Sequence, residues 1–177
     1  VNTYGFADDD RLETLAVVGG VLSSLPLDFM TKLRGQAHIY ADSVASLPVD
    51  LNHPAASLIG QRFLQLSLGH VPHPEITMEK NALRRRNRML EIDVLSALMY
   101  GITAEELCAV YSTQFPVLRK EERTDLYDSN GRKLPGEMNK LYRQRGETLS
   151  VDERTWTHPQ SGVEYVFEFP YQSFDRE

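Results

Sequence analysis

The side chains with the clearest chemical potential form a basic cluster in residues 79–89, EKNALRRRNRM. If a helix already runs through the cluster, Arg84 and Arg88 share a face, because residues four apart are neighbours on a helix. Guanidinium groups form paired hydrogen bonds to phosphate oxygens, which suits contact with a nucleic-acid backbone. The alternative is a solvated helix start whose cations pair with Glu79 and Glu91. The residues predicted to contact phosphate are Lys80, Arg84, Arg85 and Arg88.

Other cations are sparser and are weaker candidates for the same role. They are Lys32, Arg34 and Arg143, the last within a second basic patch that includes Lys140 and Arg145. The net charge of -6 argues against a protein that coats nucleic acid through bulk charge. A local basic surface is still compatible with that charge.

Residues that could bind a metal or act in catalysis are scattered along the chain. His70 and His73 form an H-x-x-H pair, but a zinc site needs further ligands, and no Cys or His cluster follows. The run Asp8–Asp10 fits a helix N-terminus, where carboxylates meet the positive end of the dipole, better than a metal site. One alternative is an enzyme with an unrecognised site built from scattered residues such as Asp28, His38 and Tyr40, which would require a deep pocket with strongly shifted pKa values. Apart from this alternative, no catalytic, cofactor-binding or metal-binding residue is predicted.

A helix must follow the basic cluster and position it. Apolar residues recur at helical spacing at Leu90, Val94, Leu95, Leu98 and Met99. Gly101 predicts the end of this helix, since glycine tolerates the left-handed C-cap conformation. Thr103 and Glu106 then form the capping-box pattern that begins a second helix. Pro116 ends that helix, because the residue before a proline is pushed out of helical geometry.

Three more helices are predicted upstream. In the first, residues 12–22, Gly19 and Gly20 cost about 1 kcal/mol each but would let another backbone approach closely. Its predicted inner face comprises Leu12, Leu15, Ala16, Gly19 and Leu22. Ser24 and Pro26 predict the start of a second helix that ends near Gly35. Asn52 is the predicted N-cap of a third, residues 54–68.

Downstream of Pro116 the pattern predicts hairpins around one short helix, residues 135–145. Asn130-Gly131 is a favoured two-residue turn because both positions accept positive φ, with 126–127 and 133–134 as flanking strands. Residues 163–171 alternate apolar and polar side chains and predict a strand with one aromatic face. The predicted fold class is α+β, a predominantly helical core with two small antiparallel hairpins in the C-terminal half. A boundary near residue 72, in a proline-containing linker, would separate residues 1–72 from 73–177.

Composition limits the class of protein. At 177 residues, one domain or two small ones are expected. The single Cys108 excludes an internal disulfide and fits a reducing cytosol. No apolar run approaches the ~20 residues of a membrane span, and the N-terminus lacks the pattern of a signal peptide. The initial Val favours a fragment of a longer protein.

The run EIDVLSALMYGITAEELCAVYSTQFPVL, residues 91–118, resembles a segment near the C-terminus of large bacterial adenine-N6 DNA methyltransferases. These enzymes belong to fused restriction–modification systems and to phage-defence systems of the BREX and DISARM type. Upstream, residues 21–24, Phe29 and residues 47–49 resemble a piece of their target-recognition domains. The YDxxGR hairpin at residues 127–132 is also similar, so the resemblance covers residues 12–145.

The resemblance implies a non-catalytic piece of such an enzyme. The family holds the flipped adenine with an Asn/Asp-Pro-Pro-Tyr/Phe motif and S-adenosylmethionine with a Gly-rich turn, and neither motif occurs in this chain. A cofactor, S-adenosylmethionine, is therefore expected only in the parent enzyme. The implied partners are double-stranded DNA and the catalytic domain of the parent, and the implied location is the cytoplasm.

The alternative function is a protein–protein docking module of a phage-defence complex. The acidic balance of the chain would match a basic partner among the subunits of that complex. An exposed apolar patch on the helix of residues 12–22 would favour this alternative.

Overall fold

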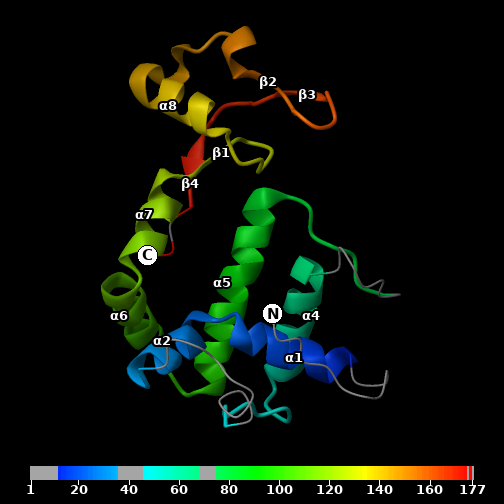
Figure 1. The fold of residues 1–177 in the computed structure, drawn as a ribbon, viewed down its shortest axis with the longest axis vertical. Coiled ribbons are helices and arrows are strands. Elements are labelled where there is room, and N and C mark those ends of the chain that lie inside the picture. The colour runs from blue at the N-terminus through cyan, green and yellow to red at the C-terminus, as the bar shows by residue number, and fades with distance from the viewer. Residues whose placement is uncertain (1–11, 36–45, 68–74, 175, 177) are drawn as a thin grey trace. The chain divides into compact units, whose positions relative to one another are not determined.

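The computed structural model describes residues 12–35, 46–67, 75–174 and 176 (Figure 1). Seven α-helices lie in these residues: α1 (Leu12–Leu22), α2 (Leu25–Leu33), α4 (Ala56–Ser67), α5 (Ala82–Met99), α6 (Ala104–Gln114), α7 (Pro116–Thr124) and α8 (Gly136–Arg145). The short strands form two antiparallel pairs, β1 (Leu126–Tyr127) with β4 (Gln172–Ser173), and β2 (Thr155–Thr157) with β3 (Glu164–Val166). The predicted fold class, α+β with a mostly helical core, is confirmed.

The chain forms two compact units. Unit 1 comprises Val1–Glu79 and Asn87–Phe115, and unit 2 comprises Lys80–Arg86 and Pro116–Glu177. The helix α5 therefore begins in unit 2 and continues in unit 1. The boundary predicted near residue 72 lies outside the described residues and stays a prediction.

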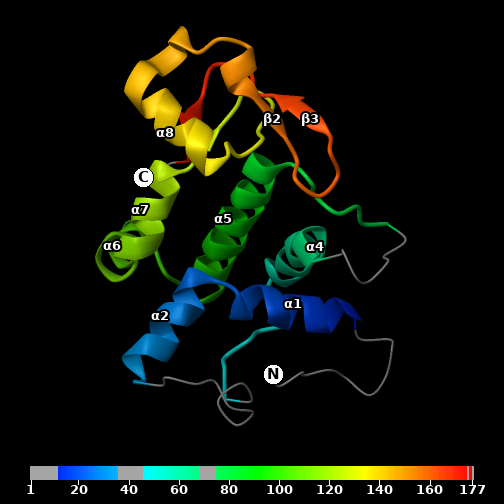
Figure 2. The ribbon, with the colours of Figure 1, turned by 45° about the horizontal axis from the view of Figure 1, so that its top comes forward.

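In unit 1, α1 and α4 lie against each other (Figure 1 and Figure 2). Glycines of both helices lie at this contact. A Cβ added to Gly20 would lie 2.5 Å from Ile59 Cγ2, and one added to Gly60 would lie 3.1 Å from Val17 Cγ2. The predicted close approach at the glycine pair is therefore confirmed. The inner face of α1 differs from the predicted one, because the buried residues are Ala16, Val17, Gly20 and Val21. Of the predicted face only Ala16 is buried, since the glycines rather than the leucines meet α4.

The start of α4 also differs from the prediction. The helix begins at Ala56 rather than Pro54, so Asn52 lies four residues before its first residue and is not its N-cap. The Asn52 backbone amide instead donates to Asp50 Oδ1 at 2.9 Å. His53 stabilises the turn before the helix: its Nδ1 accepts from Ala55 N at 3.1 Å, and its carbonyl accepts from Ala56 N at 2.9 Å. The following predicted residues lie outside the described part of the chain: Asp8–Asp10, His38, Tyr40, His70 and His73.

The inner face of α5 is more polar than predicted. Its buried residues are Ile92, Asp93, Ser96 and Ala97, whereas Val94 is 43% exposed and Leu98 is 57% exposed. Of the predicted apolar residues, Leu95 and Met99 pack against the core of unit 1. This face contains the buried Asp93 because its carboxylate accepts a hydrogen bond from the start of α2.

Asp93 caps α2 from a distance of 68 residues along the chain. The Leu25 amide at the start of α2 donates to Asp93 Oδ1 at 2.7 Å. Ser24 is the N-cap residue, as predicted, but its side chain makes no cap hydrogen bond, because its Oγ donates to the Val21 carbonyl at 2.7 Å. A carboxylate at this helix end also meets the positive end of the dipole. Asp93 therefore replaces the local cap with a long-range one.

Replacing Asp93 with alanine should destabilise unit 1 by about 2 kcal/mol, since the partly buried Leu25 amide loses its charged acceptor. Urea denaturation followed by the far-ultraviolet signal of the helices measures this change. The control is Asp93→Asn, which keeps an acceptor oxygen and should lose clearly less. Equal losses in the two variants would contradict a capping role.

The predictions for α6 hold, and an additional helix follows it. The Thr103 amide donates to Glu106 Oε2 at 2.8 Å, and the Glu106 amide donates to Thr103 Oγ1 at 3.3 Å, which completes the capping box. The Thr103 amide and the Thr103 hydroxyl both donate to the Glu106 carboxylate, and these two bonds lower the pKa of Glu106. Gly101 has φ +68°, as its predicted stop position requires. The helix ends at Gln114, but Pro116 then begins α7, where its fixed φ suits the first helical position.

In unit 2, the hydrophobic core comprises Leu126, Leu134, Met138, Phe167 and Tyr171. The turn before Leu134 differs from the predicted two-residue form, because Gly131 has φ +74° whereas Asn130 has a negative φ. The turn spans Asp128 to Gly131 and is closed by a 2.8 Å bond from Gly131 N to the Asp128 carbonyl. Tyr127 and Lys133 form a single bridge, while β1 pairs with β4.

The other predicted C-terminal elements are shorter than expected. The aromatic strand is limited to β3, and Val163 is 46% exposed. The helix α8 is confirmed and ends at Arg145, followed by Gly146 as its C-cap residue with φ +61°. Within the described residues no single helix is long and apolar enough to span a membrane. The helices α1 and α2 would be long and apolar enough if taken as one segment, but a bend of 62° separates them.

Candidate nucleic-acid interface

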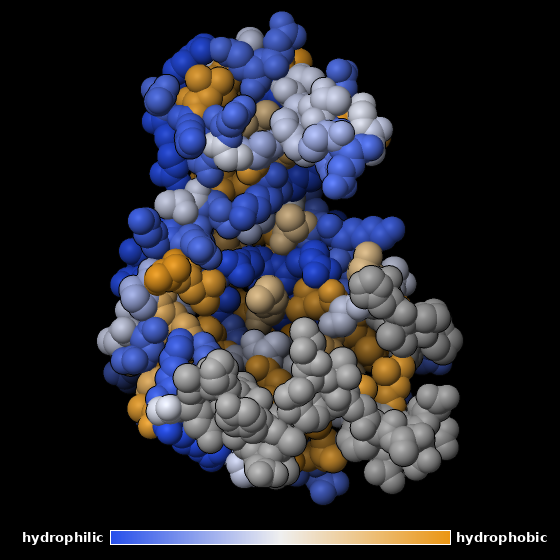
Figure 3. Space-filling model, in the orientation of Figure 1, coloured by the Kyte–Doolittle hydropathy of each residue, from blue (hydrophilic) through white to orange (hydrophobic). Residues whose placement is uncertain are grey.

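Charge is distributed unequally between the two units. Unit 2 holds 14 Lys and Arg against 12 Asp and Glu, a net charge of +2. Unit 1 holds 5 against 13, a net charge of -8. On the face shown in Figure 3, hydrophilic residues (blue) cover much of unit 2. Since nucleic-acid contact requires a local basic surface, unit 2 is the better candidate for it.

Asn81 fixes the start of α5 in unit 2. Its Oδ1 accepts from the Arg84 amide at 3.0 Å, which is an N-terminal cap. Its Nδ2 donates to the Asn130 carbonyl at 2.6 Å, and the Leu83 amide donates to the Gly131 carbonyl at 2.9 Å. The backbone at the start of α5 is therefore held against the turn of residues 128–131.

The predicted phosphate contacts separate into two groups. Lys80 and Arg84 are exposed, and in the described part of the chain neither side chain forms an ion pair or a hydrogen bond. Arg85 is half-buried and has an interaction partner. Arg88 Nη1 bonds Glu91 Oε1 at 2.5 Å, and Glu91 also pairs with Arg62 of α4. Lys80 and Arg84 are therefore the cations of the cluster that are open to an external phosphate.

The Arg86 side chain serves the interior of unit 2. Its Nη2 lies 3.3 Å from Oε1 of Glu122, whose side chain is fully buried on α7. Arg176 Nε donates to both Glu122 oxygens at 2.8 and 2.9 Å. Burial raises the pKa of Tyr127, and the charge of Arg86 opposes this rise. The buried carboxylate therefore attaches α5 and the C-terminal segment to α7.

The weaker candidates also have partners within the protein. Lys32 pairs with Asp28 at 3.0 Å and lies 3.8 Å from the centre of the Phe115 ring. Arg34 Nη1 lies 3.4 Å from Ser46 Oγ. Arg143 donates to the Thr124 carbonyl at 3.0 Å and so caps the C-terminus of α7. Lys32 and Arg34 belong to unit 1 and Arg143 to unit 2, so the seven predicted cations are divided between the two units.

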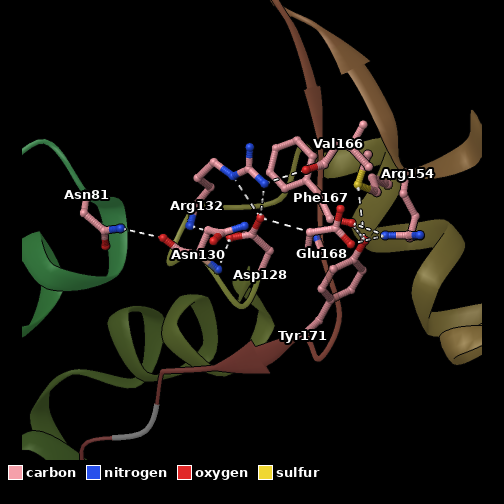
Figure 4. Close-up of polar contacts among 10 residues, drawn as sticks. Asn81, Asp128, Asn130, Arg132, Arg154, Val166, Phe167, Glu168 and Tyr171 are labelled. Atoms are coloured by element: carbon pink, nitrogen blue, oxygen red, sulfur yellow. Dashed lines mark hydrogen bonds and ion pairs between the residues drawn. The ribbon is translucent and has the colours of Figure 1, made fainter. Parts of the chain in front are cut away.

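Asp128 organises the turn that contacts Asn81 (Figure 4). The YDxxGR pattern of residues 127–132 contains Asp128, but the sequence alone assigned no role to its side chain. Its side chain is fully buried, and Oδ1 accepts from the amides of Asn130 at 3.0 Å and Arg132 at 2.8 Å. Oδ2 accepts from Arg132 Nε at 2.9 Å and Nη2 at 2.6 Å. The Glu168 amide donates to the same oxygen at 3.4 Å. One carboxylate therefore joins the turn to the segment that follows β3.

A second arginine supports the same segment. Arg154 Nη1 donates to the Phe167 carbonyl at 2.7 Å and pairs with Glu168 Oε2 at 3.0 Å (Figure 4). The Tyr171 hydroxyl donates to the Phe167 carbonyl at 3.1 Å, and burial raises the pKa of Tyr171. In the sequence, the YDxxGR pattern is the signal for the Asp128–Arg132 pair, because it places Arg132 four residues after Asp128.

The described residues contain no group of three His, Cys, Asp or Glu side chains that could hold a metal ion. Asp28, the described member of the scattered catalytic candidates, lines a cavity of about 230 Å³ between α1 and α2. A groove of about 630 Å³ beside α1 and α4 has Glu13 and Glu75 among its lining residues. Neither lining, as the structure describes it, includes a histidine, cysteine or tyrosine.

Comparison of the chain with protein-family models, with curated proteins and with solved structures finds no match.

Proposed function

We propose that this chain is a non-catalytic C-terminal part of a bacterial adenine-N6 DNA methyltransferase of the restriction–modification or phage-defence type, and that unit 2 binds double-stranded DNA. The proposal is supported by the resemblance over residues 12–145 and by the concentration of basic residues in unit 2. The parent enzyme would supply S-adenosylmethionine chemistry and the base pocket, and would act in the bacterial cytoplasm.

One observation carries the DNA-binding part of the proposal. Lys80 and Arg84 are exposed on a helix start that Asn81 holds in place, and the described structure provides neither with an ion-pair partner. Cations near a helix N-terminus oppose the positive end of the dipole, so a nearby negative group would stabilise them. A phosphate of the DNA backbone would be such a group, and Arg84 would bind it through two hydrogen bonds.

The test is binding of a labelled random-sequence duplex at low and moderate salt. The wild-type chain should bind, with an affinity that falls steeply as salt rises, because phosphate contacts release counterions. The variant Lys80→Ala/Arg84→Ala should bind more weakly at low salt. Its slope of log affinity against log salt should be smaller by about 1 to 2, the value for one or two lost phosphate contacts.

The matched control is Lys120→Ala/Lys140→Ala, which removes the same charge from exposed positions of α7 and α8. This variant should retain most of the binding. Equal losses in both variants would indicate attraction by overall charge and would contradict a localised site at the start of α5. Absence of wild-type binding at low salt would contradict the proposed function.

The second candidate function is docking onto another protein of the same defence system. The predicted patch on residues 12–22 does not support it, because α1 buries Ala16, Val17 and Val21. A different observation favours it: Val94 and Leu98, four residues apart on α5, are both exposed on a unit with net charge -8. A basic partner with an apolar contact surface would match these residues.

A further inference from the structure

We infer that the turn of residues 128–131 is a base-reading element, with the Asn130 carboxamide as its specificity-determining group. This inference rests on the proposed DNA binding and assigns the sequence-selecting contact, which the cations Lys80 and Arg84 do not supply. Phosphate contacts position a protein on a duplex, whereas hydrogen bonds to base edges specify the sequence.

The first argument is the rigidity of the turn backbone. The Asn130 amide donates to Asp128 Oδ1 at 3.0 Å, and its carbonyl accepts from Asn81 Nδ2 at 2.6 Å. The Ser129 amide donates to the Glu168 carbonyl at 3.0 Å. The Gly131 carbonyl accepts from the Leu83 amide at 2.9 Å. We call Ser129 and Asn130 the tip of the turn. Its backbone is fixed by hydrogen bonds to the start of α5, to the buried Asp128 and to the segment after β3.

The second argument is that, within the described part of the chain, the side chains at the tip make no hydrogen bond. Ser129 and Asn130 are exposed, and among the described residues neither side chain has a hydrogen-bond partner. The structure therefore presents a polar amide on a fixed backbone. Presentation of this kind lowers the entropic cost of binding, because the backbone that carries the group is already ordered.

The third argument is the neighbourhood of the tip. The Asn81 side chain contacts the Asn130 carbonyl (Figure 4). Asn81 directly follows Lys80 in the chain, and its Oδ1 accepts from the Arg84 amide. The two open cations therefore belong to the same helix start that holds the tip. Phosphates bound by these cations would bring the bases of the same duplex towards Asn130.

The chemistry of the carboxamide indicates which base it would select. Asparagine can donate to N7 and accept from N6 of adenine in the same plane, a paired contact in the major groove. Such a contact discriminates against the wrong base by about tenfold or more. An aspartate of the same shape can only accept, and it would favour the amino group of cytosine.

The experiment is selection of bound sequences from a random duplex pool by the full chain. The wild type should enrich a consensus that contains adenine at one position or more. Asn130→Ala should lose the preference at one adenine and bind the wild-type consensus about tenfold more weakly. Its binding to the unselected pool should change by less than about twofold, since phosphate contacts persist. Asn130→Asp should shift that position towards cytosine.

The control is Asn87→Ala, an exposed asparagine of α5, which should leave the consensus unchanged. Fluorescence of Trp156 should show that each variant keeps unit 2 folded. A consensus retained by Asn130→Ala, or a wild type that binds DNA without any consensus, would overturn this inference while the proposed DNA binding stands. A wild type that binds no duplex would overturn both.

Discussion

Replacing Asp128 with alanine is expected to destabilise unit 2 by about 3–5 kcal/mol, the usual cost of removing one partner from a buried ion pair. The carboxylate is fully buried and accepts from three backbone amides and from the Arg132 guanidinium. Without it, these amides lose their acceptor, and Arg132 keeps a partly buried charge that is no longer neutralised. This loss is a large fraction of the total stability of a small domain, which is about 5–15 kcal/mol.

Trp156 provides a measurement that is specific to unit 2. It is the single tryptophan of the chain, and it packs against the core that contains Leu126 and Phe167. Urea denaturation followed by its fluorescence should show a large decrease in midpoint for Asp128→Ala. Asp128→Asn should fall between this variant and the wild type, because it retains an acceptor oxygen but no charge.

The matched control for this prediction is Asp125→Ala. Asp125 also pairs with a cation of the hairpin, Lys133 at 2.6 Å, but its partner is half exposed. A solvent-exposed pair contributes about 1 kcal/mol or less. An Asp128→Ala variant as stable as Asp125→Ala would show that the buried network does not hold the turn, and would remove the structural basis for a rigid tip.

The sequence predicted well those features whose partners are close in the chain. Gly101, Thr103 and Glu106 define the end of one helix and the start of the next within six residues, and the structure confirms each of them. Local backbone preferences decide such features without tertiary contacts. The close packing at the glycine pair of α1 was also predictable from the sequence. Glycine destabilises a helix interior, so two adjacent glycines inside a helix indicate that another backbone approaches there.

Features that depend on distant partners were not predictable in the same way. Asp93 caps a helix 68 residues away, and Glu122 attracts Arg86 and Arg176 to the interior of unit 2. Their effect reaches the candidate site, because Glu122 removes Arg86 from the surface while Lys80 and Arg84 stay exposed. A run of arginines indicates a charged helix start, but tertiary packing decides which of them remain open to a ligand.

The glycine pair leads to the second large effect, in unit 1. Gly20→Leu is expected to destabilise unit 1 by about 3 kcal/mol, a typical cost of overpacking a tight contact. A Cβ at Gly20 would lie 2.5 Å from Ile59 Cγ2 and 3.2 Å from the Ile59 carbonyl oxygen. The methyl group can rotate away, but the carbonyl belongs to the backbone of α4, so α1 and α4 would have to separate.

Gly19→Ala is the control within the same helix, because its nearest atoms are the end of the Phe63 ring, at 2.6 and 2.7 Å, and a ring can turn aside. The alanine also gains about 1 kcal/mol of helix propensity, so this variant should be much closer to the wild type than Gly20→Leu. Hydrogen exchange of the α1 and α4 amides measures the effect, since it reports the opening of these helices directly. Unchanged protection in Gly20→Leu, or greater loss in Gly19→Ala, would contradict the close crossing at Gly20.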